Sequence, residues 1–152
     1  MTVKNALTAE RLTSDNFTLH SQLEADTIEL ANFPLCKLLL CNDSAYPWFI
    51  LVPKVTDITE IYQLDWSQQQ QLLNESSLLS ELLIQVFTGD KMNVAALGNV
   101  VAQLHVHHVV RFKSDAHWPK PIWGQQGMTP YTKDELGTLK AQLIPKLTAL
   151  LV

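Results

Sequence analysis

The chain has 152 residues, a length that fits one domain, and its net charge is −4. Apolar residues make up 47% of it and charged residues 17%, which provides for an ordinary buried core and excludes a disordered chain. The acidic balance argues against a broad basic surface for nucleic acid, but backbone amides and a few side chains can still build a local phosphate site.

Membrane segments and export signals are not expected. The longest apolar runs, such as residues 48–53 and 147–152, are too short to span a bilayer, and residues 1–5 lack the apolar stretch of a signal peptide. Cys36 and Cys41 fall in one predicted strand region, where a disulfide is awkward and a zinc site lacks further ligands. We therefore expect a reduced, cytoplasmic protein with no cofactor, no structural metal and no membrane partner.

The first third of the chain predicts short strands joined by turns. Turn-forming residues and alternating apolar residues divide this part, and Pro53 ends its last strand because proline cannot donate to a ladder. The expected elements are a strand and a short helical turn within residues 17–25, strands over 27–31, 37–42 and 48–52, and turns at 32–34 and 42–47.

A helix is expected next, because apolar residues recur at helical spacing as far as Phe87. Asp65 or Ser67 can cap its start. Residues 88–90 close this helix, and a strand over residues 92–96 follows.

The second half continues with a break at Gly98 and Asn99, a strand over roughly residues 100–112, and an irregular tryptophan-bearing segment at 117–124. The last helix, about 132–151, begins with a capping box at residues 132–135, and Pro145 should kink or restart it. These elements predict one α+β domain over residues 1–152, with a mostly antiparallel sheet and two main helices. Its core spans about residues 17–124.

Three of the five histidines lie in the strand predicted over residues 100–112. Side chains alternate between the faces of a strand, so Gln103, His105 and His107 should point one way and His108 the other. Imidazoles titrate near neutral pH and serve as nucleophile, acid or ligand. We therefore expect chemistry at His105 and His107, and a packed or hydrogen-bonded His108.

Residues 103–109 resemble the motif H-x-H-x-H-x-x of the histidine triad (HIT) family, in which x is apolar, with glutamine at the first histidine position. Four other segments are similar to the family in the same order. They are the strand and proline-lysine end at 48–54, the short segment at 58–61, the strand and glycine loop at 92–99, and His-Trp-Pro at 117–119. The resemblance covers roughly residues 38–123.

The resemblance implies a five-stranded antiparallel sheet with helices, a homodimer, and a nucleotidyl hydrolase or transferase. Its small-molecule substrate would be a nucleotide with a phosphoanhydride or phosphoramidate bond. His105 would attack the α-phosphate to form a covalent nucleotidyl-histidine, and His107 would contact phosphate oxygens and help proton transfer to the leaving group. Such a nucleophile needs one free ring nitrogen, and its other nitrogen should donate to a backbone carbonyl.

The resemblance also implies residues that bind the nucleotide or its phosphates, and one aromatic contact. These are Asn42, Asp43, Asn93, Asn99 and Gln103, with Trp118 as the aromatic residue. A structural role stays open for Asn42 and Asp43, because they fall in a turn that favours such residues in any case.

Two other functions stay open. Gln103, Val100 and Trp48 replace a histidine, a serine or threonine, and a histidine of the family pattern, which is compatible with a nucleotide-binding or interaction protein that has little turnover. A His-x-His pair on a strand can also supply two metal ligands, with His117 or Asp115 as a third.

Overall fold

The computed structural model describes residues 11–125 and 127–150. Its centre is a five-stranded sheet in the order β1-β2-β3-β5-β4, and each neighbouring pair is antiparallel. The strands are β1 (Thr27–Asn32), β2 (Cys36–Cys41), β3 (Trp48–Pro53), β4 (Lys91–Ala95) and β5 (Val106–Arg111). Residues 1–5, where no export signal was expected, and residue 151 of the predicted last helix lie outside the described residues.

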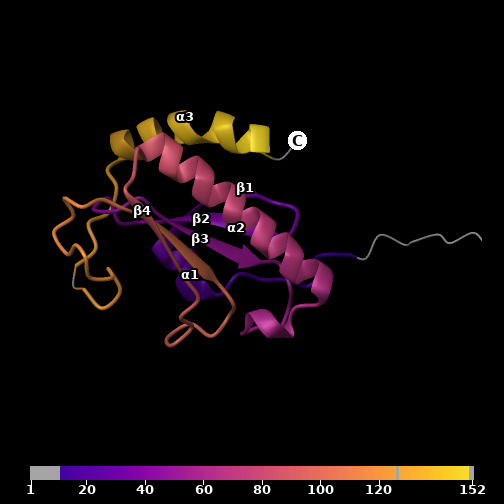
Figure 1. Cartoon of the computed structure of the whole chain (residues 1–152). Helices are drawn as coiled ribbons and strands as arrows, with labels where there is room; N and C mark the ends of the chain where they lie inside the picture. Colours follow the sequence, from indigo (N-terminus) through magenta and orange to yellow (C-terminus); the bar gives the residue numbers. More distant parts are fainter. Residues whose placement is uncertain (1–10, 126, 151–152) are drawn as a thin grey trace, which may run out of the picture.

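Helices cover the two faces of the sheet unequally. The two long helices, α2 (Trp66–Phe87) and α3 (Lys133–Leu150), lie together on one face, and the short α1 (Ser21–Asp26) lies on the other (Figure 1). A single 3-10 turn, η1 (Ile61–Gln63), precedes α2. The predicted α+β fold with two main helices is confirmed. Among the described residues, no helix is both long and apolar enough to cross a membrane.

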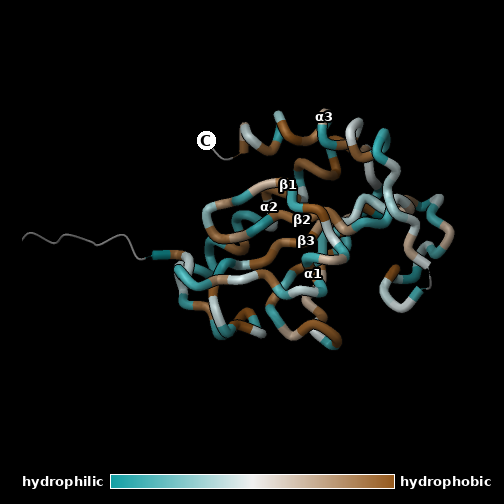
Figure 2. Tube along the Cα trace, turned by 180° about the vertical axis from the view of Figure 1, so that it is seen from behind, coloured by the Kyte–Doolittle hydropathy of each residue, from teal (hydrophilic) through white to brown (hydrophobic). Residues whose placement is uncertain are grey.

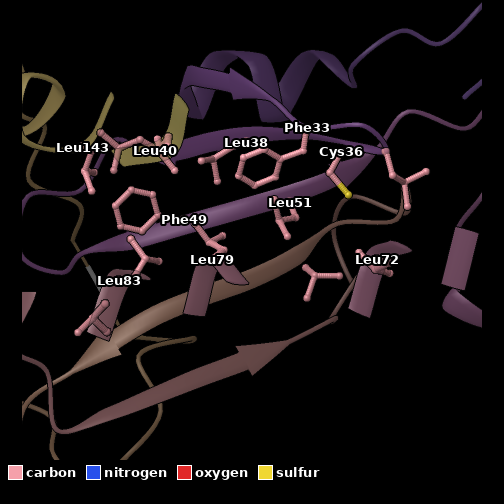
Figure 3. Close-up of a cluster of buried hydrophobic side chains, with 14 of the residues drawn as sticks. Phe33, Cys36, Leu38, Leu40, Phe49, Leu51, Leu72, Leu79, Leu83 and Leu143 are labelled. Carbon is pink, nitrogen blue, oxygen red and sulfur yellow. The ribbon is translucent and has the colours of Figure 1, made fainter. Parts of the chain in front are cut away.

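The main core lies between the sheet and the two long helices. Phe49 and Leu51 of β3 meet Leu79 and Leu83 of α2 and Leu143 of α3 there (Figure 3). A smaller cluster, with Leu23, Leu39 and Ile50, packs on the opposite face. Both faces of β2 and β3 are therefore buried, and these strands form nearly continuous hydrophobic runs (brown in Figure 2).

The helix ends follow their capping residues. The side chain of Asp65 accepts a hydrogen bond from the amide of Gln68, which selects Asp65 over Ser67 as the cap of α2. Thr132 and Glu135 form the predicted capping box of α3. That helix continues through Pro145 without a restart.

Two predicted strands differ from the structure. Residues 17–20 form no strand, and only the helical turn of that region, α1, is present. The histidine strand begins at Val106, six residues later than expected, because β3 pairs with it only up to Leu51 and Val106. The backbone before it is held by a loop, where Leu104 donates its amide to the carbonyl of Ile58.

Candidate active site

A cavity of about 370 Å³ opens on the face of the sheet opposite α2 and α3. It is lined by α1, β3, the loop over residues 97–101, the histidine segment, and the tryptophan-bearing segment. Its polar and aromatic lining residues include Asp26, Thr27, Trp48, Asn99, His105, His107 and Trp123. A second cavity of about 460 Å³, beside β1, has no histidine in its lining, which includes the ion pair of Lys37 with Glu29.

The sheet register brings the lining side chains together. Ile50 of β3 pairs with His107 of β5, so both side chains lie on the cavity face. Trp48 lies two residues before Ile50 and is therefore a diagonal neighbour of His107 on that face. His105 stands one residue before β5, and its ring meets that of His107 edge to face at a centroid distance of 4.9 Å. Only 7% of His105 and 8% of His107 are exposed.

The ring of His105 is held by the backbone two residues earlier. Its Nδ1 lies 2.7 Å from the carbonyl oxygen of Gln103, and a carbonyl only accepts, so Nδ1 carries the proton. In the neutral ring, the lone pair is then on Nε2. This arrangement provides the free nitrogen that a nucleophile needs.

His107 is held by two indole rings. Nε1 of Trp48 donates to Nδ1 of His107 at 2.9 Å, so Nδ1 accepts and the neutral ring carries its proton on Nε2. Trp123 packs against the same imidazole at a centroid distance of 5.6 Å. Burial, followed by repulsion from the charged forms of His105 and His108, lowers the pKa of His107 to about 3. His107 is therefore uncharged near neutral pH.

His108 faces away from the cavity, as expected. Its Nδ1 donates to the carbonyl of Val106 at 3.0 Å, and the hydroxyl of Ser76 in α2 donates to its Nε2 at 2.7 Å. Burial lowers the pKa of His108 to about 4. His108 thus ties β5 to α2 as a neutral structural residue.

Residues 22–114 match the family model of the HIT domain. The chain belongs to the HIT family. Its sheet and helices also superpose on solved histidine triad proteins. One from Marinobacter aquaeolei VT8 is 54% identical, with a TM-score of 0.86, over 90% of this chain and 98% of that one.

Two further histidine triad proteins of known structure are similar over most of their length. The protein from Bradyrhizobium japonicum is 43% identical, with a TM-score of 0.83, over 86% of this chain and 97% of that one. The protein from Sinorhizobium meliloti 1021 is 38% identical, with a TM-score of 0.83, over 86% of this chain and 96% of that one. No curated protein matches the chain.

Of the residues predicted to bind the nucleotide, Asn99 lines the cavity of this HIT domain together with His105 and His107. It lies in the loop after β4, next to Gly98, whose φ of +68° favours glycine. Its neighbour Val100 is 95% exposed. The glycine loop therefore places one amide side chain and one apolar side chain at the mouth of the cavity.

Asn42 and Asp43, two of the residues predicted to bind the nucleotide, do not line this cavity. Oδ1 of Asn42 accepts from the amide of Tyr131 at 3.0 Å. Oδ1 of the buried Asp43 accepts from the amides of Ala45 and Thr129 at 3.1 and 3.2 Å. Both side chains join the end of β2 to the segment before α3, because buried amides in that loop require acceptors. The structural role that the turn allowed is the one observed.

Asn93 and Trp118 lie around a buried arginine and not at the cavity. Oδ1 of Asn93 accepts from Nη1 of Arg111 at 2.9 Å, and Asp115 accepts from Nε of the same guanidinium at 2.8 Å. The ring of Trp118 lies over Arg111, with the guanidinium carbon 5.8 Å from its centroid. A guanidinium that is 1% exposed needs such partners, which explains the position of both residues.

The side chain of Gln103 also points away from the cavity. Its amide oxygen accepts from the amide N–H of His20, and its amide nitrogen donates to the carbonyl of Thr18, each at 2.8 Å. Only its main-chain carbonyl contacts His105. The expected alternation therefore fails at Gln103, because the chain before Val106 is loop and not strand.

The sequence did not single out Asp26 or Trp123 for this site, and it treated Trp48 only as a departure from the family pattern. Asp26 ends α1 and lines the cavity, where it supplies a carboxylate. No spacing pattern in the sequence relates these residues to the histidines, because the sheet and the loop after β5 bring them together.

The alternative of a metal site on the histidine pair needs at least a third ligand. The described residues contain no group of three or more His, Cys, Asp or Glu side chains that could hold a metal ion. Asp115, one of the two residues considered as that ligand, is bound to Arg111.

Proposed function

We propose that this HIT-family chain is a nucleotidyl hydrolase or transferase that attacks a nucleotide α-phosphate through a covalent nucleotidyl-histidine at His105. The observation that carries this proposal is the hydrogen bond from Nδ1 of His105 to the carbonyl of Gln103. In the neutral form of the ring, this bond leaves the lone pair on Nε2, and the ring lines a cavity. The ring of His107 lies beside it and can contact the phosphate.

The reaction has two displacement steps. In the first, Nε2 of His105 forms a bond to phosphorus, while the bond to the leaving group breaks and its electron pair departs with that group, which takes up a proton. In the second, a water oxygen bonds to phosphorus, the N–P bond breaks, its electron pair returns to His105, and the water loses a proton. Each step needs positioning and charge stabilisation more than other covalent help.

The cavity suits a nucleotide in its chemistry. Ile50, Trp48 and Trp123 offer apolar and aromatic surface for a base, and Asp26 offers a carboxylate that can accept hydrogen bonds from ribose hydroxyls. Asn99 can donate its amide N–H to phosphate oxygens. The expected substrates are nucleotides with phosphoanhydride or phosphoramidate bonds.

Trapping the intermediate tests this function. The protein is incubated with adenosine phosphoramidate and with diadenosine polyphosphates, quenched, and mapped by mass spectrometry. We expect turnover and a nucleotidyl adduct on His105, and neither in His105→Ala. Equal turnover by the two proteins, or an adduct on another residue, would disprove the assignment.

A nucleotide-binding protein with little turnover is a second candidate. It is favoured by the departure at Val100, an apolar and almost fully exposed residue where the family pattern has a hydroxyl that touches phosphate. Calorimetry with AMP separates the two functions, since micromolar binding without hydrolysis supports only this candidate. Absence of AMP binding would contradict both.

We also propose that the protein is a homodimer. Exposed apolar residues lie on one side of α2 and on the adjacent edge strand β4, namely Trp66, Leu73 and Val94. Leu73 lies one turn before Ser76, and Ser76 binds His108, whose partner on β4 is Val94. These residues therefore form one apolar face, defined here as the α2–β4 face, which a second copy can cover.

The remaining assignments concern the chain as a whole. We propose one domain over residues 1–152 that works in the cytoplasm. Cys36 and Cys41 are free, and both are buried at the ends of β2, which is consistent with a reducing compartment. Nucleic acid, membranes and cofactors have no part in the proposed reaction.

A further inference from the structure

We propose that Trp48 is a positioning residue that holds His107 as a neutral imidazole with its proton on Nε2, so that His107 donates a hydrogen bond to a phosphoryl oxygen and is not a proton source. This inference rests on the proposed nucleotidyl transfer at His105. The inference gives a role to Trp48, which stands where the family pattern has a histidine.

The geometry of the contact determines its direction. An indole N–H only donates, so the 2.9 Å contact between Nε1 of Trp48 and Nδ1 of His107 requires a lone pair on Nδ1. The two side chains are diagonal neighbours on one face of the β3–β5 pair, since Trp48 lies opposite Val109 and His107 opposite Ile50. The pair lies inside the sheet, with β2 on one side and the edge strand β4 on the other, and this pairing keeps the two rings in place.

A second proton on His107 would have to bind Nδ1, where it would meet the indole hydrogen of Trp48. Burial opposes the charge as well, because the rings of Trp48 and Trp123 both pack on the imidazole, each at a centroid distance of 5.6 Å. Of the other titratable groups, His105, Asp26 and Cys41 line the same cavity, and His108 lies behind it on β5. His105 and His108 both disfavour a positive charge on His107.

A neutral imidazole is suited to hydrogen bonding and not to acid catalysis. Loss of the Nε2 proton from a neutral ring would leave an imidazolate anion, which is far too basic to form near neutral pH. The same N–H can stabilise the charge that develops on a phosphoryl oxygen as His105 attacks. The leaving group then takes its proton from water, and His107 has the same protonation state before and after each step.

Nitrogen-15 NMR of the histidine rings in the whole protein tests this directly, without any substrate. In the wild type we expect His107 to show an unprotonated Nδ1 and a protonated Nε2 over about pH 5–8, the range in which ordinary histidines titrate. In Trp48→Phe, which keeps an aromatic ring and removes the donor, we expect a mixture of tautomers and a titration shifted toward neutral pH. A protonated Nδ1 in the wild type would overturn the inference.

Trp123→Phe is the matched control, because Trp123 packs on the same imidazole but its buried Nε1 has no hydrogen-bond partner among the residues that the structure describes. We expect this variant to keep the wild-type tautomer of His107. If Trp123→Phe and Trp48→Phe change the spectrum equally, packing and not the hydrogen bond sets the tautomer, and the inference is wrong.

Kinetics provide a second measurement. We expect Trp48→Phe to lower kcat roughly 10–100-fold, as the loss of a residue that orients a functional histidine does elsewhere, and to add a pH-dependent step absent from the wild type. Trp48→His, which retains a ring N–H, should recover part of kcat. An unchanged pH profile in Trp48→Phe would contradict the role of Trp48. Absence of turnover in the wild type would contradict the proposed function but leave the NMR result to decide on the tautomer.

Discussion

The rings of His105 and His107 meet edge to face, with their centroids 4.9 Å apart, and carry their protons on different nitrogens. The backbone carbonyl of Gln103 places the proton of His105 on Nδ1, and the indole of Trp48 places the proton of His107 on Nε2. One imidazole therefore offers a lone pair and the other a hydrogen. The two histidines differ in their chemistry because His105 binds an acceptor, the carbonyl of Gln103, and His107 binds a donor, the indole of Trp48.

Replacing His107 should reduce turnover without preventing formation of the nucleotidyl adduct. We expect His107→Ala to lower kcat about 10²–10³-fold, because it removes one hydrogen-bond donor from the developing phosphoryl charge. His107→Gln should lose less, since its amide also carries N–H groups. Rapid-quench kinetics of adduct formation, with circular dichroism to verify the fold, measures both variants. A complete absence of adduct in folded His107→Gln would show that an N–H donor is insufficient.

Buried neutral histidines should make the fold sensitive to acid. His108 has a pKa of about 4 in the folded chain, below its usual value, so the unfolded chain binds its proton first as pH falls. Its contribution to stability is present above about pH 6.5 and is lost between there and about pH 4. Over this range we expect the free energy of unfolding to fall by about 1.4 kcal/mol per pH unit for this one group.

The variant His108→Gln isolates that contribution, because the other titrating groups are common to both proteins. Urea unfolding at a series of pH values should give a shallower pH dependence for His108→Gln than for the wild type. Parallel curves for the two proteins would mean that His108 is already protonated in the folded state or does not titrate in this range.

Glu75 should be essential for the turn between β1 and β2. Glu75 is a buried residue of α2, and its carboxylate accepts from the amides of Leu35 and Cys36 at 2.7 and 3.0 Å. Glu75→Ala would leave two buried N–H groups unpaired, at a cost of about 1–3 kcal/mol for each. Chemical denaturation should show a smaller loss for Glu75→Gln, which keeps one acceptor oxygen. Equal stability of Glu75→Ala and the wild type would mean that these amides find other partners.

The proposed dimer should depend on the α2–β4 face. Leu73→Glu places a charge on that face and should yield a monomer in light scattering at micromolar protein concentration, because an unpaired buried charge costs several kcal/mol. Leu78→Glu is the control: Leu78 is another exposed leucine of α2 but lies on a different side of the helix. A wild-type monomer, or a dimer in both variants, would rule out this interface.

Much of the fold was predictable because its signals are local. Asp65 caps α2 by accepting from the amide of Gln68, only three residues further along the chain. Pro53 ends β3 because it lacks an N–H. The start of β5 was not predictable in this way. Apolar and histidine residues from 100 onward look like a strand, but a strand also needs a neighbour to pair with, and β3 pairs with this segment only as far as Leu51, opposite Val106.

The sequence by itself determined the family, the order of the elements and the histidine pair, since a residue spacing of two places His105 and His107 near one another. Only the tertiary structure decided what surrounds that pair. Trp48 donates to His107 from 59 residues away, and Asn42 binds an amide 89 residues further along. Hydrogen-bond partners that distant are set by strand register and loop packing. For that reason Trp48 lines the cavity beside His107, whereas Asn42, Asp43 and Asn93 do not line it.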